Sequence, residues 1–170
     1  MAFQLNVNNP AAVVGSMQSF MNSETGKNRQ VGVSLVQIIA NGASEATHQI
    51  NVFYPSLDVI ERNAAQNAQS ADWARYMNTM SESAERVSEN MFSVQMSHVN
   101  QDVANQPGAT SMLTMIKVTD PSTYIESMKQ MMSSDAAGAF LARSISVRLL
   151  VGARTRQPIG LISSLPTWRA

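Results

Sequence analysis

The segment that opens this chain recurs, with many substitutions, at a constant displacement of 111 residues. Met17 corresponds to Met128 and Met21 to Met132, and no gap is needed along the match. In both copies the residue patterns predict the same order of elements: a strand, an Asn-Pro or Asp-Pro pair, a Met-rich helix, a strand, a turn and a strand. A duplicated unit of this kind restricts the possible folds more than any other feature of the chain.

The first copy, residues 1–99, predicts a complete unit in the order β-α-β-β-α-β. Phe3, Leu5 and Val7 alternate with polar residues, which is typical of a half-buried strand. Segment 31–40 is apolar on both faces and is therefore expected to be buried on both sides. The expected strands are residues 2–7, 31–40, 47–54 and 91–99, and the expected helices follow Asn9, Ser56 and Ser70, the last of them reaching Val87.

The second copy is shorter. Residues 100–110 are polar, contain Pro107-Gly108 and predict a linker. Residues 111–170 then predict a helix at 121–134, strands at 112–118, 144–151 and 159–163, and a turn at 152–157. They hold no counterpart of the long helix and fourth strand of the first copy, so we expect the second repeat to be truncated.

This order of elements is ferredoxin-like, and the chain resembles one branch of that fold, the dimeric α+β barrel superfamily. The resemblance lies in Asn9-Pro10 and Asp120-Pro121, which open the helix after the first strand, and in Tyr54-Pro55-Ser56 and Leu165-Pro166-Thr167, which follow the third. The superfamily includes antibiotic-biosynthesis monooxygenases and stress-responsive barrel proteins. The resemblance implies an α+β fold in which tandem ferredoxin-like repeats form a barrel, within one chain or across a dimer.

Composition excludes several classes of function. The 12 basic and 12 acidic residues balance, and only 14% of residues are charged, so we expect neither nucleic acid nor an anionic membrane as a partner. Cysteine is absent, which excludes thiolate catalysis. No signal peptide and no membrane-spanning apolar run are visible, which predicts a cytoplasmic protein. A surface with so little charge favours self-association, and we expect a homo-oligomer, most simply a dimer.

Uncharged amides gather on one face of the expected sheet. Gln49 and Asn51 share a face of the third strand, and Gln95 lies on the polar side of segment 91–99. If this face lines the barrel, these three residues are ligand-binding candidates for a hydroxylated or carbonyl-rich organic molecule. The alternative is a sheet face exposed to solvent.

A catalytic site is suggested by the resemblance alone. Asn6 and Trp73 are similar to the Asn on the first strand and the Trp on the second helix of cofactor-independent monooxygenases. Those enzymes also use a His or Tyr, and Tyr54 and His98 complete the candidate site here; His48 and Tyr76 are the other possibilities. The alternative role of Trp73 is core packing, because it lies on an apolar helical stripe.

Arg148 is the remaining ligand-binding candidate. It alternates with Val147 and Leu149, so it is positioned to hold a carboxylate inside a barrel or at a subunit interface. His48 and His98 would meet if their strands shared a sheet, but no carboxylates stand at ligand spacing, and no metal is predicted. Phosphate loops and dinucleotide motifs are absent, so no cofactor is predicted either.

Two functional hypotheses follow. The first is a small-molecule-binding barrel protein, with cofactor-independent monooxygenase-like chemistry on an organic substrate as its enzymatic form. The second is a non-catalytic oligomeric barrel module that sequesters a ligand or has a structural or stress role.

Overall fold

A computed structural model describes residues 1–99, 118–135, 137 and 146–151. These residues belong to two units, which divide between Met91 and Phe92. The first unit contains strands β1 (Ala2–Val7), β2 (Gly32–Gln37), β3 (His48–Phe53) and β4 (Ala84–Asn90), and helices α1 (Pro10–Asn22), α2 (Glu24–Lys27), α3 (Leu57–Ala68) and α4 (Ala71–Ser83). The described part of the second unit contains β5 (Ser93–Val99), α6 (Pro121–Met132) and β6 (Ser146–Val151).

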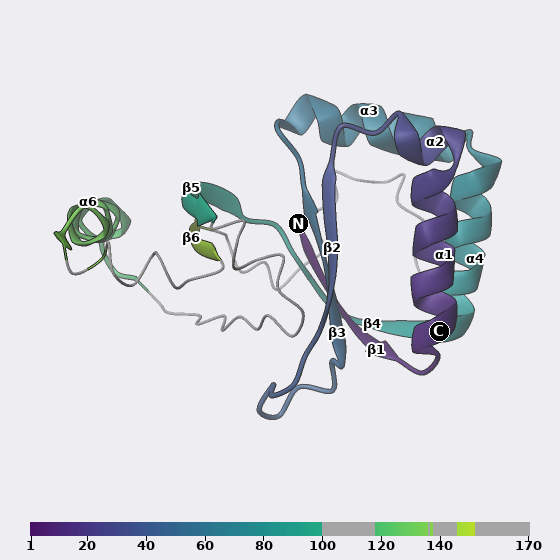
Figure 1. The fold of residues 1–170 in the computed structure, drawn as a ribbon, viewed down its shortest axis with the longest axis horizontal. Coiled ribbons are helices and arrows are strands. Elements are labelled where there is room, and N and C mark those ends of the chain that lie inside the picture. The colour runs from purple at the N-terminus through teal and green to yellow at the C-terminus, as the bar shows by residue number, and fades with distance from the viewer. Residues whose placement is uncertain (100–117, 136, 138–145, 152–170) are drawn as a thin grey trace. The chain divides into compact units, whose positions relative to one another are not determined.

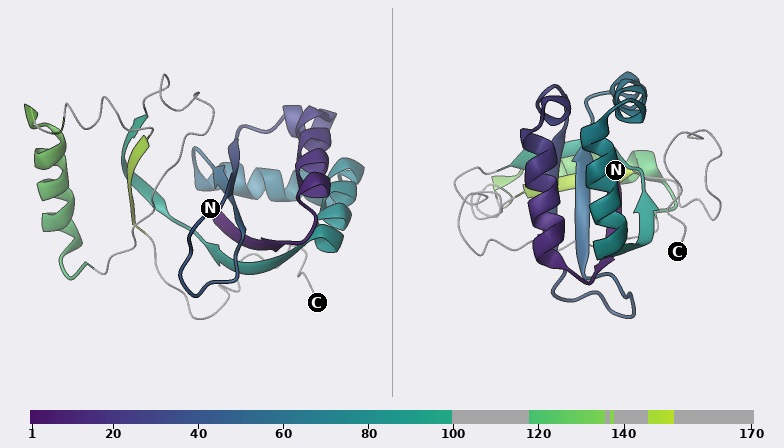
Figure 2. Two further views of the ribbon diagram at one scale, coloured as in Figure 1. Left: turned by 60° about the horizontal axis from the view of Figure 1, so that its bottom comes forward. Right: turned by 90° about the vertical axis from the view of Figure 1, so that its right-hand side faces the viewer.

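The first unit is a four-stranded antiparallel sheet with helices packed on one face. The strand order is β2-β3-β1-β4. Helix α1 connects β1 to β2, and β3 lies between these two strands. Helices α1 and α4 lie side by side across the sheet, with α2 and α3 at one end of the pair (Figures 1 and 2). The fold is therefore α+β, and its order of elements is compatible with the ferredoxin-like arrangement.

The apolar core lies between the sheet and this helix pair. Leu5, Ile50 and Met80 are among the buried residues of one cluster that joins β1, β3 and α4. Phe3 packs against the same cluster, which confirms the predicted alternation of the first strand. The predicted start of α1 is confirmed as well, because the Asn9 Oδ1 accepts a hydrogen bond from the Ala12 N–H at 3.2 Å.

The second unit contains a helix and a two-stranded ladder in its described part. α6 begins as predicted at Pro121, with Asp120 as its N-cap. Hydrogen bonds from Ser122 and Thr123 lower the pKa of the Asp120 carboxyl to about 2. β6 pairs antiparallel with β5. The expected strand at residues 159–163, the turn at 152–157 and most of the strand at 112–118 lie outside the described residues.

The fourth strand of the sheet was predicted wrongly. It is β4, directly after α4, whereas segment 91–99 was expected to form it. The helix stops because Ala84 adopts an extended conformation, with φ −156° and ψ 146°. The backbone N–H groups of Asn8 and Asn9 then donate to the Ser83 carbonyl at 3.0 and 3.2 Å. The apolar spacing that suggested a helix to Val87 continues into the strand, so spacing alone does not reveal the change.

The second strand was also predicted to be buried on both sides, and this is wrong. β2 is an edge strand, and none of its residues is fully buried. Val33 and Leu35 face the core, whereas Val36 is 40% exposed on the other side. The predicted turn after it is present, since Gly42 has a φ of 58°, a conformation that glycine adopts without steric cost.

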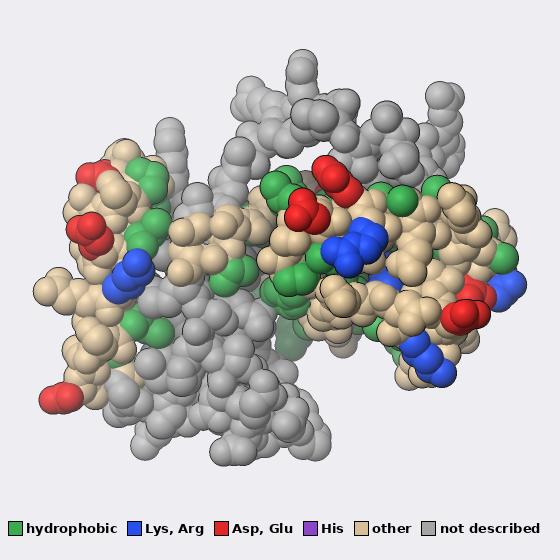
Figure 3. Space-filling model, turned by 90° about the horizontal axis from the view of Figure 1, so that it is seen from above, with side chains coloured by type: hydrophobic (Ala, Val, Ile, Leu, Met, Phe, Trp, Pro, Cys, Tyr) green, Lys and Arg blue, Asp and Glu red, His purple; other side chains and the backbone are tan. Residues whose placement is uncertain are grey.

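The distribution of charged side chains on the surface agrees with the low charge of the chain. On the face shown in Figure 3, acidic and basic side chains of the described residues lie in small groups separated by uncharged surface. Among the described helices, none has the length and the apolar character needed to cross a bilayer.

The turn between α1 and α2 leaves no room for a side chain at Gly26. A Cβ at this position would lie 2.0 Å from the Phe20 carbonyl oxygen and 2.8 Å from the Met21 Cα. Both are backbone atoms, so the clash cannot be relieved by a side-chain rotation. Gly26 is therefore a steric requirement of the path that the chain takes after α1.

We expect Gly26→Ala to lower the free energy of unfolding by more than about 2 kcal/mol, because overpacking against backbone forces the two helices apart. Urea unfolding followed by circular dichroism measures this. Gly15→Ala is the matched control, since nothing lies within 4 Å of a Cβ there. It should raise stability by about 0.5–1 kcal/mol through helix propensity. A Gly26→Ala protein as stable as the wild type would contradict the steric argument.

Candidate functional site

A cavity of about 140 Å³ lies between the sheet and the helices of the first unit. Its walls come from β1, β2 and β3 on the sheet side and from α1, α3 and α4 on the helix side. Most of the lining is apolar and includes Leu5, Met17, Ile50, Ile60, Met77 and Met80. A concave apolar space with a few polar groups is the usual form of a small-molecule site.

Three aromatic side chains form one wall of the cavity. Phe20 comes from α1, and Trp73 and Tyr76 come from α4. The ring centroids of all three pairs are 5.2 Å apart, with Phe20 edge-on to Trp73 and stacked on Tyr76. Contacts of this geometry stabilise by about 0.5–1.5 kcal/mol per pair beyond the burial of area. The three rings therefore form a firm wall and hold α1 against α4.

Arg29 supplies a positive charge beside this wall. Its guanidinium carbon lies 5.4 Å from the Phe20 centroid and 5.3 Å from the Trp73 centroid. The Nη1 donates to the Asn67 Oδ1 at 3.4 Å, and the side chain also forms a hydrogen bond with Tyr54. Burial lowers the pKa of Arg29, which the neighbouring tyrosines oppose. A guanidinium nevertheless stays protonated at neutral pH.

Two hydrogen-bond donors in the cavity lining find no acceptor among the described residues. They are the Nε of Arg29 and the Nδ2 of Asn63, both buried without a partner. Asn63 is only 4% exposed. A buried donor without an acceptor costs about 1–3 kcal/mol, so such groups are rare in folded proteins and call for an explanation.

The phenols beside Arg29 resist ionisation. Burial raises the pKa of Tyr76 to about 12, an effect that the nearby positive charge of Arg29 only partly offsets. Burial likewise raises the pKa of Tyr54, while Arg29 opposes the change. Both hydroxyl groups therefore keep their protons over the physiological range.

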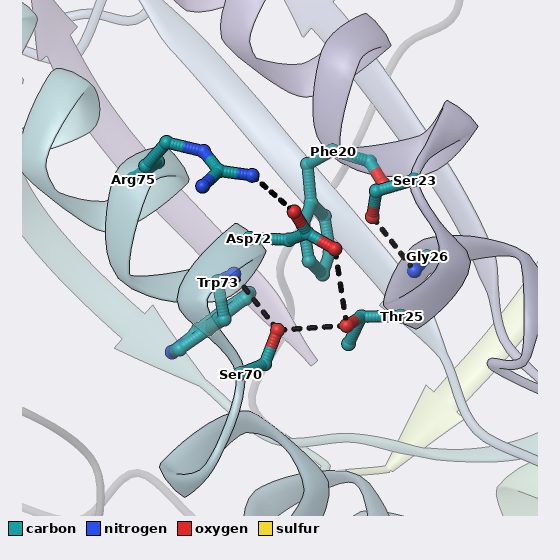
Figure 4. A network of polar contacts seen from close by, with 8 residues as sticks. All are labelled: Phe20, Ser23, Thr25, Gly26, Ser70, Asp72, Trp73 and Arg75. Atoms are coloured by element: carbon teal, nitrogen blue, oxygen red, sulfur yellow. Dashed lines mark hydrogen bonds and ion pairs between the residues drawn. The ribbon is translucent and has the colours of Figure 1, made fainter.

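A polar network fixes the turn after α1 to the start of α4 (Figure 4). The hydroxyl oxygens of Thr25 and Ser70 lie 2.7 Å apart, and Ser70 Oγ accepts the backbone N–H of Trp73 at 3.1 Å. Thr25 also donates to Asp72 at 3.4 Å, and Asp72 forms an ion pair with Arg75. The network thus holds the aromatic wall and the loop that carries Arg29 in one arrangement.

Of the four predicted catalytic residues, the structure brings two together. Trp73 and Tyr54 line the same cavity. Asn6 does not line it, because it alternates with the core residues Leu5 and Val7 and lies on the other face of β1. His98 lies in β5 of the second unit, and its side chain is outside the description.

Two of the amides predicted to bind a ligand, Gln49 and Asn51, lie on the sheet face opposite the helices. There they form a continuous chain of hydrogen bonds across all four strands. Asn51 donates to Ser34 at 3.3 Å, Gln49 to Asn51 at 2.7 Å, Gln4 to Gln49 at 3.4 Å and Ser88 to Gln4 at 2.9 Å. Gln49 and Asn51 therefore satisfy each other and do not line the cavity. Their predicted role in ligand binding stays a prediction.

The remaining candidates belong to the second unit. Gln95 lies on β5, is exposed and donates to Ser93 at 2.9 Å. Arg148 lies on β6 opposite Ser97, and its side chain is not described. The condition under which His48 and His98 would meet is not fulfilled, because the first lies in β3 and the second in β5, and the two strands belong to different sheets. In the described parts of the chain, no cluster of three or more metal-ligating side chains occurs.

Sequence reasoning missed Arg29 and Asn63. Asn63 had a readable signal, since it follows Val59 by four residues and so interrupts the buried stripe of α3 with a polar side chain. Arg29 had no such signal in the sequence, because it lies in a polar loop whose path depends on the turn at Gly26.

A scan against protein-family models and searches of curated proteins and of solved structures find no significant match to this chain. The site is therefore interpreted from its own residues.

The raised pKa of Tyr76 predicts a loss of stability in alkali. An unfolded tyrosine loses its proton near pH 10, whereas the folded protein holds the Tyr76 proton until about pH 12. The folded state then binds more protons than the unfolded state, so stability falls as the pH rises from 10 to 12, by about 2–3 kcal/mol from this residue. Urea unfolding at pH 9 and pH 11.5 should show this loss. Tyr76→Phe keeps the ring and should lose less stability over the same interval; an equal loss in both proteins would contradict the assignment.

Proposed function

We propose that the first unit is a binding module for a small, largely apolar organic molecule, with the cavity beside Phe20, Trp73 and Tyr76 as its site. The observation that carries the proposal is this cavity of about 140 Å³, lined by aromatic and methionine side chains. Protein interiors are close-packed, and voids much larger than a water molecule are few. An engineered apolar cavity of about 150 Å³ binds benzene, so the volume suits a molecule with one small ring.

The lining residues support binding of a flat molecule in particular. Aromatic rings offer faces and edges that pack against another ring at low cost in conformational entropy. Met17, Met77 and Met80 add flexible, polarisable side chains that adapt to irregular shapes. The site therefore combines rigid aromatic side chains with flexible methionine side chains.

Binding is favoured over the monooxygenase-like hypothesis. That chemistry was expected from Asn6 acting together with Trp73, and the two residues lie on opposite faces of the sheet. Trp73 and Tyr54 are the predicted residues that share the cavity, and there they serve as a binding wall and a hydrogen-bonding group. We assign no reaction to them.

We further propose that residues 111–170 are a diverged copy of the first repeat. At the displacement of 111 residues, the cap bond from Ala12 N–H to Asn9 recurs between Thr123 and Asp120, both at 3.2 Å. The bond from Ser23 Oγ to the Phe20 carbonyl recurs between Ser134 and Met131, both at 2.7 Å. These matching contacts at both ends of α1 and α6 support a tandem ferredoxin-like architecture.

The dimeric barrel follows from the same proposal. The sheet face opposite the helices carries an internally hydrogen-bonded row of amides, which can meet another sheet without leaving polar groups unsatisfied. Light scattering on the purified 18.5 kDa chain tests the association. We expect a particle of twice that mass; a monomer at high protein concentration would contradict the dimer.

Filling the cavity tests the binding proposal. Toluene should bind the wild-type protein with a dissociation constant of about 0.1–1 mM, as expected for a ligand of this size. Ala64 lines the cavity, so Ala64→Leu should weaken toluene binding at least about tenfold by occupying the space. Nitrogen–proton correlation spectra recorded during a titration measure both constants.

Ala65→Leu is the matched control, because Ala65 is the exposed neighbour of Ala64 on α3. It should bind toluene as the wild type does. The proposal fails if the wild-type spectrum does not respond to toluene, or if Ala64→Leu and Ala65→Leu bind it equally well.

A further inference from the structure

The cavity that we propose as a binding site has a polar end that an apolar ligand alone would not use. Building on that proposed function, we propose that the bound molecule is a small organic carboxylate, and that Arg29 together with Asn63 holds its carboxylate group while the aromatic wall holds its apolar body. The inference concerns the ligand class, and it depends on charge and on unmet hydrogen bonds.

The charge of Arg29 lacks a counter-ion among the described residues. The other arginine of the cavity lining, Arg86, is paired with Glu89 at 2.9 Å. On α4, Arg75 is paired with Asp72. No described carboxylate forms such a pair with Arg29, although it is less exposed than a typical surface arginine. A partly buried charge of this kind is stabilised by an anion of opposite sign.

Among the described residues, the buried side-chain atoms of the cavity lining without a hydrogen-bond partner are both donors. The Nε of Arg29 and the Nδ2 of Asn63 carry N–H groups without acceptors, and Asn63 is 96% buried, being 4% exposed. A guanidinium has no acceptor atom, and the amide nitrogen of an asparagine only donates. Acceptor atoms of a bound molecule would satisfy both groups. A carboxylate supplies two oxygens and a negative charge at once.

The shape of the guanidinium favours a carboxylate as well. The guanidinium lies beside Phe20 and Trp73, and Asn67 accepts a hydrogen bond from one of its nitrogens. The Nε has no acceptor among the described residues, and a carboxylate can accept from this side of a guanidinium in a paired geometry. Tyr54 and Tyr76 keep their hydroxyl protons, so they add donors and no competing negative charge.

Asn63 links the polar end to the apolar body of the site. It comes from the face of α3 that also brings Ile60 and Ala64 to the cavity. A ligand whose oxygens reach Asn63 and Arg29 therefore has its apolar part among these side chains and the aromatic wall. A single-ring carboxylate satisfies both requirements within the volume available.

The test compares benzoate with benzamide, a neutral molecule of nearly the same shape, and with toluene. Titrations followed by nitrogen–proton correlation spectra at pH 7 give the three dissociation constants. We expect benzoate to bind the wild-type protein at least about tenfold more tightly than benzamide, as charge-assisted hydrogen bonds predict. Arg29→Met should remove this preference while toluene still binds. Arg62→Met, a change at an exposed position of α3, is the control and should keep it.

Two further variants keep the test decisive if Arg29→Met does not fold. Arg29→Lys keeps the charge but loses the planar fork, so the preference for benzoate should fall without disappearing. Asn63→Asp puts a carboxylate inside the site, where it should pair with Arg29 and abolish benzoate binding while toluene binding persists.

The outcomes separate this inference from the proposed function. If toluene binds and benzoate binds no better than benzamide, the carboxylate inference is overturned and the apolar binding site stands. The inference is also overturned if the benzoate preference survives in both Arg29→Met and Asn63→Asp. If none of the three molecules binds the wild-type protein, the proposed function fails and the inference fails with it.

Discussion

The close backbone contact at Gly26 is the constraint on which the rest of the first unit depends. The Phe20 carbonyl accepts hydrogen bonds from the backbone N–H of Ser23 at 3.1 Å and from its hydroxyl at 2.7 Å. Those bonds end α1 and turn the chain so tightly that residue 26 has no space for a side chain. Thr25 then binds Ser70 at the start of α4, which fixes the loop that carries Arg29. The aromatic wall and its cation are thus positioned by one turn.

The polar groups on the two faces of the sheet differ in whether they have hydrogen-bond partners. On the face opposite the helices, Gln4, Gln49 and Asn51 donate and accept in sequence, so their amides are satisfied within the sheet. On the helix face, the few polar groups beside the cavity include two buried donors without acceptors. A satisfied row rigidifies a sheet, whereas unmet donors beside a cavity favour binding of an acceptor. This difference is why the site is assigned to the helix face, although the amides are more conspicuous in the sequence.

Local signals predicted the elements whose ends are set by caps. Asn9-Pro10 and Asp120-Pro121 were sufficient for α1 and α6, because the cap bond and the proline act within one turn of helix. β4 was missed because Ala84 and Val87 fit both a helical stripe and a strand, and pairing with β1 decides between them. The cavity could not be predicted, since Arg29 reaches it from a loop and meets rings from α1 and α4 only after the helices have packed. Trp73 and Tyr54 were found by analogy, and the reason for their proximity was not in the sequence.

Under the proposed tandem relation, the residues that position the site in the first copy have no equivalents in the second. At the same displacement, Gly26 corresponds to Ala137, and the Ser134 Oγ accepts the Ala137 N–H at 3.3 Å, against 3.1 Å from Gly26 to Ser23. Ala137 carries the Cβ for which Gly26 has no space. Thr25, which ties the first turn to α4, corresponds to an alanine, and Arg29 corresponds to Phe140. In that alignment the second copy has neither the glycine of the tight turn nor the cation that the turn positions. The proposed duplication therefore leaves the tight turn, and the proposed site that depends on it, in the first copy.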